Sequence, residues 1–136
     1  MGHSYSTMCS NCSNSEDHLM GIGMRGPYNM DGIIEYNKSM RDKVFFKYIR
    51  DNKNAKLSSK SSYKMYECPS CKTLHSRFYI KINYDNNELY VKEYYCGKCH
   101  NILVPLDEDN IKIKNYYCKK CNKKTLGKGM SFIQWD

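Results

Sequence analysis

The sequence predicts a small α+β protein that is mostly β and has a thin core. Such a protein needs cross-links, such as disulfides or bound metal, to stay folded. Three observations lead to this fold class. Only 40% of the 136 residues are hydrophobic, and Tyr supplies much of that share, with 13 residues against 4 Phe and 1 Trp. All eight cysteines occur in C-x-x-C pairs. Segments of alternating character flank these pairs, as in β-strands. Small chains with so few aliphatic residues usually need staples.

The cysteine pairs belong to one repeated element, which we call knuckles one to four in chain order. The pairs are Cys9/Cys12, Cys68/Cys71, Cys96/Cys99 and Cys118/Cys121. The last three follow a Lys-x-Tyr stretch, namely Lys64/Tyr66, Lys92/Tyr94 and Lys114/Tyr116, whereas knuckle one follows Tyr5 and Thr7. Further strands are expected after the knuckles, in HLMGIGM, SRFYIKINY, NILVPL and LGKGMSFIQW. Strand, knuckle, strand is the layout of a zinc ribbon, in which two knuckles complete a tetrahedral site of four cysteines.

Metal ligation is the chemistry that this cysteine pattern favours. The start of the chain has no apolar stretch typical of a signal peptide, and no run reaches the roughly 18 apolar residues of a membrane span. A reducing, cytoplasmic setting therefore fits best. We expect the cysteines to bind metal as thiolates there and not to form disulfides. We expect two structural Zn²⁺ per chain, bound by all eight cysteines. Iron remains an alternative metal. His75 and His100 are alternative ligands, but four cysteines already close each site.

Two arrangements of the knuckles are open. Eighteen residues separate knuckles three and four, an ordinary ribbon spacing. We therefore prefer one site made of Cys96, Cys99, Cys118 and Cys121, and a second made of Cys9, Cys12, Cys68 and Cys71. The alternative joins knuckles two and three and leaves the outermost knuckles to meet. We prefer the first arrangement because the alternative must bring the two ends of the chain together.

The preferred arrangement divides the chain into two ribbons. Residues 1–82 form the first, with an inserted helix at about 32–50 and a polar, mobile loop at about 51–62, and residues 83–136 form the second. The two ribbons either stay separate or pack as one body. Apolar residues recur at helical spacing between Ile33 and Tyr48. Asp31 is the expected N-cap. The fold class is thus a mostly β, metal-stapled α+β protein with two four-cysteine zinc ribbons, each an antiparallel hairpin, and one inserted helix.

GIGMRG, at 21–26, matches the G-x-G-x-x-G pattern of dinucleotide-binding proteins. That fingerprint requires a βαβ unit with a helix opening on the glycines. Here Pro27 follows at once and biases Gly26 away from helix. We interpret the stretch as a glycine-loosened strand and expect no nucleotide cofactor.

A hairpin from Arg77 to Cys96 offers a candidate binding surface. With its turn at Asn86-Asn87, Ile82 faces Val91 and Tyr84 faces Leu89 on the inner side. Tyr79 then faces Tyr94, and Lys81 faces Lys92, on the outer side. Tyr and Lys side chains on an open sheet can stack bases and hold phosphates. The candidate nucleic-acid-binding residues are Tyr79, Lys81, Lys92, Tyr94, Lys112, Lys114, Tyr116, Lys119 and Lys120. The competing interpretation is a solvated β-face that only covers a thin core.

Charge distribution agrees with a nucleic-acid partner. The net charge is +8, and seven Lys stand against one acid from Ile111 to the end. The partner is DNA or RNA in our first hypothesis. In the alternative, the chain is a protein–protein interaction adaptor that uses the inserted helix or the acidic middle of the chain, at 83–110. No catalytic grouping or open metal position is evident, so we expect no enzyme activity.

The knuckles resemble those of the zinc-ribbon superfamily. More closely, the chain resembles a group of small bacterial zinc-ribbon proteins, through MGHSY before the first C-x-x-C, GIGM leading to Pro27, three later pairs and a terminal QWD. The resemblance implies the double zinc-ribbon fold and a bacterial, cytoplasmic protein, and it leaves the activity open. The superfamily's usual knuckle reads C-P-x-C-G. Knuckle two keeps the proline, as Cys68-Pro69, whereas knuckle three has Cys96-Gly97 in its place.

Overall fold

The computed structural model describes residues 2–22, 27–107, 111, 113–129 and 134–135. This part of the chain forms an elongated molecule with two antiparallel sheets and two helices, so the mostly β, α+β class is confirmed. The helices are α1 (Met30–Tyr36) and α2 (Met40–Asn52). The strands are β1 (Gly2–Cys9), β2 (Ser15–Gly21), β3 (Lys56–Leu57), β4 (Ser62–Glu67), β5 (Leu74–Tyr79), β6 (Lys81–Tyr84), β7 (Glu88–Val91), β8 (Val104–Pro105), β9 (Leu126–Lys128) and β10 (Gln134–Trp135).

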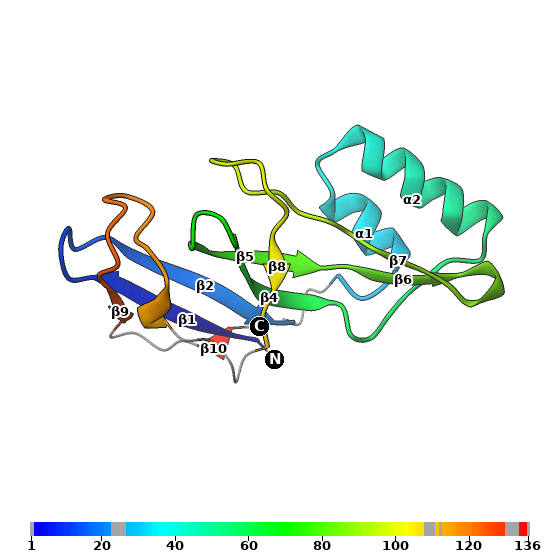
Figure 1. Cartoon of the computed structure of the whole chain (residues 1–136). Coiled ribbons are helices and arrows are strands. Elements are labelled where there is room, and N and C mark those ends of the chain that lie inside the picture. The colour runs from blue at the N-terminus through cyan, green and yellow to red at the C-terminus, as the bar shows by residue number, and fades with distance from the viewer. Residues whose placement is uncertain (1, 23–26, 108–110, 112, 130–133, 136) are drawn as a thin grey trace.

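The larger sheet joins the two ends of the chain. Its strand order is β10-β1-β2-β4-β5, with β8 beside β4 and β9 beside β1. Gly2 pairs with Trp135 at one end of β1, and Cys9 pairs with Leu126 at the other. The N- and C-termini consequently lie next to each other in Figure 1. The smaller sheet has the order β3-β6-β7 and lies with the helices at one end of the molecule (Figure 1).

A helical insertion is present, but as two helices and not one. Asn37 ends α1 in an extended conformation, and the Ser39 hydroxyl then caps α2 by accepting from the Asp42 N–H at 3.4 Å. Polar groups that bond to the local backbone compete with the helix at this point. The expectation of one continuous helix over 32–50 was therefore wrong.

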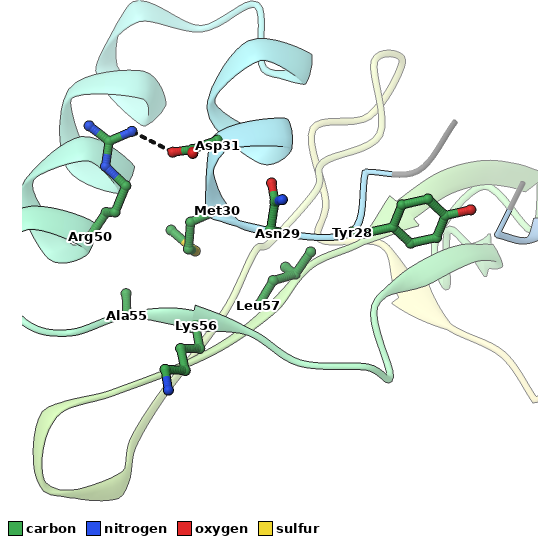
Figure 2. Close-up of a pocket in the computed structure, with 8 residues that line it drawn as sticks. All are labelled: Tyr28, Asn29, Met30, Asp31, Arg50, Ala55, Lys56 and Leu57. Atoms are coloured by element: carbon green, nitrogen blue, oxygen red, sulfur yellow. Dashed lines mark hydrogen bonds and ion pairs between the residues drawn. The ribbon is translucent and has the colours of Figure 1, made fainter. Parts of the chain in front are cut away.

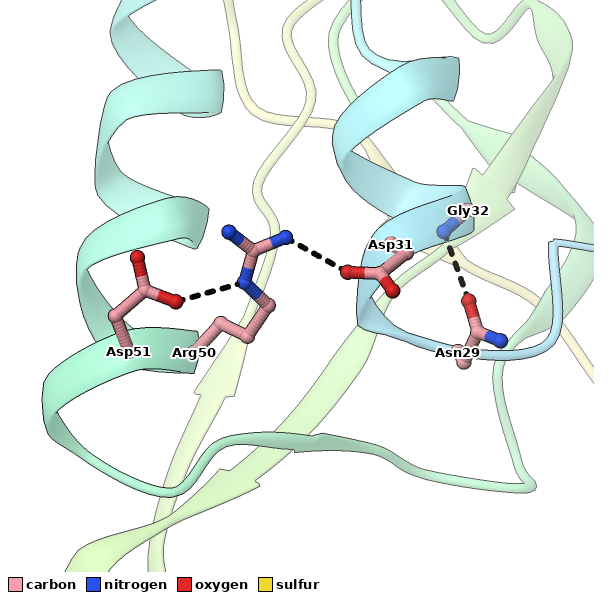
Figure 3. Close-up of polar contacts among 5 residues, drawn as sticks. All are labelled: Asn29, Asp31, Gly32, Arg50 and Asp51. Carbon is pink, nitrogen blue, oxygen red and sulfur yellow. Dashed lines mark hydrogen bonds and ion pairs between the residues drawn. The ribbon is translucent and has the colours of Figure 1, made fainter.

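Polar contacts at the start of α1 also differ from the prediction. Arg50 of α2 donates to the Asp31 carboxylate at 2.7 Å, which links the two helices (Figure 2). The N-cap is Asn29, whose side chain accepts from the Gly32 N–H at 2.8 Å (Figure 3). Asp31 instead occupies the first turn, where a carboxylate interacts favourably with the helix dipole.

The apolar core lies mainly between the helices and the smaller sheet. Its fully buried members include Ile33, Phe46, Phe78, Ile80 and Ile82. Residues 51–62, expected to be a loop, contribute to this region, because β3 pairs with β6 and Ser61 Oγ donates to the Lys81 carbonyl at 3.2 Å. Within the described ranges, no helix has the length and hydropathy that a membrane crossing would require.

The β6–β7 hairpin has the expected turn but a different register. Asn86 and Asn87 both have positive φ, 61° and 60°, as predicted. The turn also takes in Asp85, so Ile82 faces Tyr90 and not Val91. A one-residue shift moves each side chain to the opposite face of its strand. The predicted pairs Ile82–Val91, Tyr84–Leu89 and Lys81–Lys92 were therefore wrong, and Leu89 and Val91 are exposed.

Candidate metal centres

All eight cysteines gather into two groups of four. Cys9, Cys12, Cys118 and Cys121 form one group, and Cys68, Cys71, Cys96 and Cys99 form the other. The preferred pairing of the knuckles was therefore wrong, and the alternative holds. The outermost knuckles meet because β1 pairs with β9 along their shared edge. The expected boundary between residues 82 and 83 falls inside β6, the strand that pairs with β7.

The sulfur positions of the Cys9 group are close to those around a tetrahedral metal ion, and those of the Cys68 group are tighter. Within each group the four Sγ atoms lie within 4.8 Å of one another. Zn–S bonds of about 2.3 Å in a tetrahedron would place the sulfurs about 3.8 Å apart. Cys9 and Cys121 are 3.6 Å apart, as are Cys12 and Cys118, whereas Cys68 and Cys99 are 3.1 Å apart. None of the eight cysteines forms a disulfide.

All four knuckles share one backbone geometry. The N–H of the first cysteine donates to the carbonyl five residues later, and the N–H four residues later donates back to the carbonyl of that cysteine. The residue at this fourth position has positive φ, between 57° and 63°, in every case: Ser13, Lys72, His100 and Asn122. The first cysteine of each knuckle is buried and the second is half-buried. The sequence repeat is thus a structural repeat, although the side chain at the left-handed position varies.

Hydrogen-bond donors favour the thiolate form of Cys9 and Cys99. The Thr125 hydroxyl lies 2.9 Å from Cys9 Sγ, and this contact is the main cause that lowers the pKa of Cys9 to about 6. The backbone N–H of Asn101 has the same effect on Cys99 and lowers its pKa to about 6. The hydrogen bond between Cys71 and Cys99, together with burial, raises the pKa of Cys71 to about 12. A metal ion must therefore displace protons when it binds.

The repeated Tyr residues are part of the core next to the metal centres. Tyr66 is 2% exposed and packs with Cys68 and Cys96, and its ring meets that of Tyr94 at 5.6 Å. Tyr116 packs beside Cys118, and its hydroxyl donates to Glu67 at 2.9 Å. In knuckle one, Thr7 takes this buried position. The sequence predicted that these Tyr residues belong to a binding face, whereas in the structure they pack beside the cysteines.

The described members of the predicted nucleic-acid face do not form one exposed surface. Lys92 pairs with Asp42 of α2, and the Tyr94 hydroxyl donates to the Phe78 carbonyl. Tyr79 is half-buried under the Lys64 ammonium, 4.1 Å from its ring centroid. Lys81 is half-buried in the smaller sheet, and Tyr116 is buried.

The remaining predicted residues lie elsewhere. Lys119 lies 3.7 Å from Glu16, whereas Lys120 is exposed on knuckle four. Lys112 and the side chain of Lys114 are outside the described residues, as is most of the GIGMRG stretch. His75 is buried and bonds to Thr73, and His100 is exposed. Neither belongs to the cysteine groups.

A polar cleft is lined by residues from knuckle two and from the chain around knuckle four. Its volume is about 400 Å³, and its lining comprises Glu67, Lys72, Asn115, Tyr116, Tyr117 and Lys124. The Tyr117 N–H donates to the Lys72 carbonyl at 2.6 Å, which ties knuckle two to the approach to knuckle four. Lys98 of knuckle three also donates to Asn122 of knuckle four at 2.6 Å. No signal in the sequence marks this cleft, because its residues come from different knuckles.

A second cavity, of about 340 Å³, lies where α1, α2 and β3 meet (Figure 2). Figure 2 shows Arg50 turned toward Asp31 across this space. Because Asp51 also accepts from Arg50, at 3.0 Å, the guanidinium is already neutralised by two carboxylates (Figure 3). This cavity therefore offers little to hold an anion.

Comparisons with known proteins found no relative from which a function could be inferred. No family model matches the chain, and neither does any curated protein or solved structure. The two four-cysteine groups are compatible with zinc-ribbon-like sites. The superfamily and the bacterial origin remain predictions that rest on the sequence resemblance.

Proposed function

We propose that the protein is a non-enzymatic, cytoplasmic, zinc-stabilised module that binds single-stranded nucleic acid in the polar cleft at knuckles two and four. Zn²⁺ is the proposed metal because it suits four thiolates and needs no redox chemistry. Four thiolates leave no coordination position for substrate or water, so the metal's role in this proposal is structural.

The observation that carries the proposal is the composition of the cleft. Lys72 and Lys124 supply ammonium groups, and Tyr117, 40% exposed, supplies a ring beside them. Lysines bind phosphates, while aromatic rings stack on the bases of single strands without sequence preference. The formal net charge of +8 falls to +4 when eight thiolates hold two Zn²⁺, and this charge still attracts polyanions at a distance. Glu67 also lines the cleft and accepts from the Tyr116 hydroxyl, and its single negative charge stands against the two lysines.

The test is binding of fluorescent single-stranded DNA and RNA to the zinc-loaded protein at several salt concentrations. We expect affinity to fall with salt, with a log–log slope of about −0.7 for each phosphate contact. Lys124→Glu should weaken binding and flatten that slope. Tyr117→Ala should cost about 1–3 kcal/mol of binding free energy if one base stacks on the ring.

Lys47→Glu is the matched control, because Lys47 is an exposed lysine on α2 and the charge change is identical. The proposal is contradicted if the control weakens binding as much as Lys124→Glu does, since only net charge would then matter. It is also contradicted if no oligonucleotide binds at low salt.

A protein adaptor is the second candidate, and one observation favours it. Met40, Val44 and Tyr48 recur every four residues on α2 and are 71%, 63% and 54% exposed. Such a stripe is the kind of helix face that docks into a partner's groove. This candidate predicts that Val44→Lys abolishes capture of a protein partner without affecting oligonucleotide binding. Retained capture by this variant would count against it.

A further inference from the structure

Strand β7 leaves one edge of the smaller sheet open. The strand order β3-β6-β7 gives β7 a partner on one side alone in the described part of the chain. The Lys92 N–H donates at 3.1 Å to the carbonyl of Ile80, the residue just before β6. The backbone groups of Lys92 therefore point toward the β6 side of the strand. Backbone direction alternates along an antiparallel strand. The N–H and C=O groups of Leu89 and Val91 therefore point to the open edge.

At four residues this edge is short, but it carries no proline, and no lysine where its backbone groups are open. Natural edge strands carry prolines, bulges or outward lysines that block a second strand. Here the residues with open backbone groups are Leu89 and Val91, which are 57% and 42% exposed. A groove of about 740 Å³ runs along the strand, between Leu89–Glu93 on one side and the start of α2, including Arg41 and Phe45, on the other. An incoming strand would have room beside β7.

The strand and the residue after it are complementary to a second copy of themselves. Glu88-Leu89-Tyr90-Val91-Lys92 reads acidic, apolar, aromatic, apolar, basic. When two copies run antiparallel about a twofold axis at Tyr90, Glu88 faces Lys92 of the second copy, and Leu89 faces Val91 of the second copy. In this register the open backbone groups of Leu89 and Val91 meet directly, as a hydrogen-bonded pair requires. Apolar pairs and opposite charges across strands are both favourable. Lys92 already pairs with Asp42 of its own copy, so the Leu89–Val91 pairs supply most of this complementarity.

We propose that the protein forms a twofold homodimer through antiparallel pairing of β7 with β7 of a second copy, which creates a continuous six-stranded sheet. Four backbone hydrogen bonds would cross the axis, two at each Leu89–Val91 pair. Both copies of α2 would lie on the same face of the joined sheet. The contact is short, and small interfaces are typically transient, so the dimer should form only in concentrated samples.

The experiment is sedimentation velocity of the zinc-loaded full chain from low micromolar to millimolar concentration, paired with amide hydrogen exchange by NMR. We expect a concentration-dependent shift from monomer to dimer. The Leu89 and Val91 amides should exchange at least tenfold more slowly at the highest concentration. The Lys92 amide, which already bonds to the Ile80 carbonyl, should stay protected at every concentration.

Two substitutions test the interface and one serves as a control. Val91→Pro removes an outward N–H without removing a bond to β6, and Leu89→Lys places a charge at the edge. Both should reduce dimerisation at least tenfold. Val44→Lys removes a similarly exposed apolar residue from α2 and should leave dimerisation unchanged.

Three outcomes would overturn the proposal. The first is a monomer at millimolar concentration with unprotected Leu89 and Val91 amides. The second is a dimer that survives both β7 substitutions. The third is a dimer that Val44→Lys abolishes, because association would then use α2.

Discussion

At the scale of single residues, the Tyr that precedes each later knuckle packs beside a group of four cysteines. Tyr66, Tyr94 and Tyr116 all contact cysteine-containing clusters, but their hydroxyl groups differ in environment. Tyr94 donates to the Phe78 carbonyl at 2.5 Å, and Tyr116 donates to Glu67. The Tyr66 hydroxyl is buried and has no hydrogen-bond partner in the described part of the chain. Burial raises the pKa of all three phenols, that of Tyr116 to about 12.

The Tyr66 and Tyr94 hydroxyls give a paired prediction. Tyr66→Phe removes an unpartnered buried hydroxyl, so the free energy of unfolding should stay the same or rise by about 1 kcal/mol. Tyr94→Phe removes a hydrogen bond, so it should lower the free energy of unfolding by about 1 kcal/mol. Urea unfolding of the zinc-saturated proteins measures both. A larger loss for Tyr66→Phe than for Tyr94→Phe would contradict this account of the two side chains.

His75 makes stability depend on pH. It is 7% exposed, and burial is the main cause that lowers its pKa to about 4, with the charges of Lys119, Arg77 and His18 adding to the effect. In the unfolded chain a His titrates near about 6.5. Between about pH 4 and 6.5 only the unfolded chain takes up this proton. Stability from this residue is therefore complete above about pH 6.5 and is lost as the pH falls toward about 4.

His75→Gln isolates this contribution. Wild type should lose up to about 1.4 kcal/mol more than the variant for each pH unit between about 6.5 and 4. The comparison uses denaturant unfolding with excess zinc at each pH, so that zinc loss affects both proteins alike. Parallel pH profiles for the two proteins would show that His75 is not the group responsible.

At the scale of elements, local patterns predicted which residues form each element but not their exact limits. The helical spacing from Ile33 to Tyr48 contains no Gly or Pro that would mark a break, yet Asn37 and Ser39 end one helix and cap the next. The hairpin turn was found at Asn86-Asn87, but Asp85 joins it. Apolar or aromatic residues occupy both faces of β7, so the sequence fits either register, and packing of Tyr90 on Phe45 and Phe46 selects the observed one.

The cap of α1 gives a prediction for this element. The Asn29 side chain accepts from the Gly32 N–H at 2.8 Å, as Figure 3 shows. Asn29→Ala should lower the free energy of unfolding by about 1 kcal/mol, whereas Asn29→Asp keeps the acceptor and should stay near wild type. Thermal and urea unfolding measure the difference. Arg50→Gln should cost less, because its partner Asp31 is 75% exposed and exposed ion pairs contribute little. Equal losses for Asn29→Ala and Asn29→Asp would argue against the cap.

At the scale of the whole molecule, the cysteine spacing predicted the ligands but not their grouping. Each knuckle is a local element, and its C-x-x-C spacing is visible in the sequence. Which knuckles meet depends on strand pairs between residues far apart in the chain, such as Cys9 with Leu126. A rule based on the short spacing between knuckles three and four misses these long-range pairs. The polar cleft was unpredictable for the same reason, since Lys72 and Lys124 meet only after the chain has folded.

The grouping of the knuckles is the central claim. Counting the zinc ions bound by two Cys-to-Ser substitution variants tests it most directly. One variant replaces Cys9, Cys12, Cys118 and Cys121 by Ser, and the other replaces Cys9, Cys12, Cys68 and Cys71 by Ser. Each removes four of the eight thiols. Native mass spectrometry after equilibration with a zinc chelator gives the number of ions per chain, and a closed site of four cysteines should survive this treatment where two thiolates do not.

The structure predicts two zinc ions in wild type, one in the first variant and none in the second. The first variant leaves Cys68, Cys71, Cys96 and Cys99 together, whereas the second leaves two cysteines in each group. The reverse result, none in the first variant and one in the second, would mean that knuckles three and four share a metal ion and would contradict the fold described here.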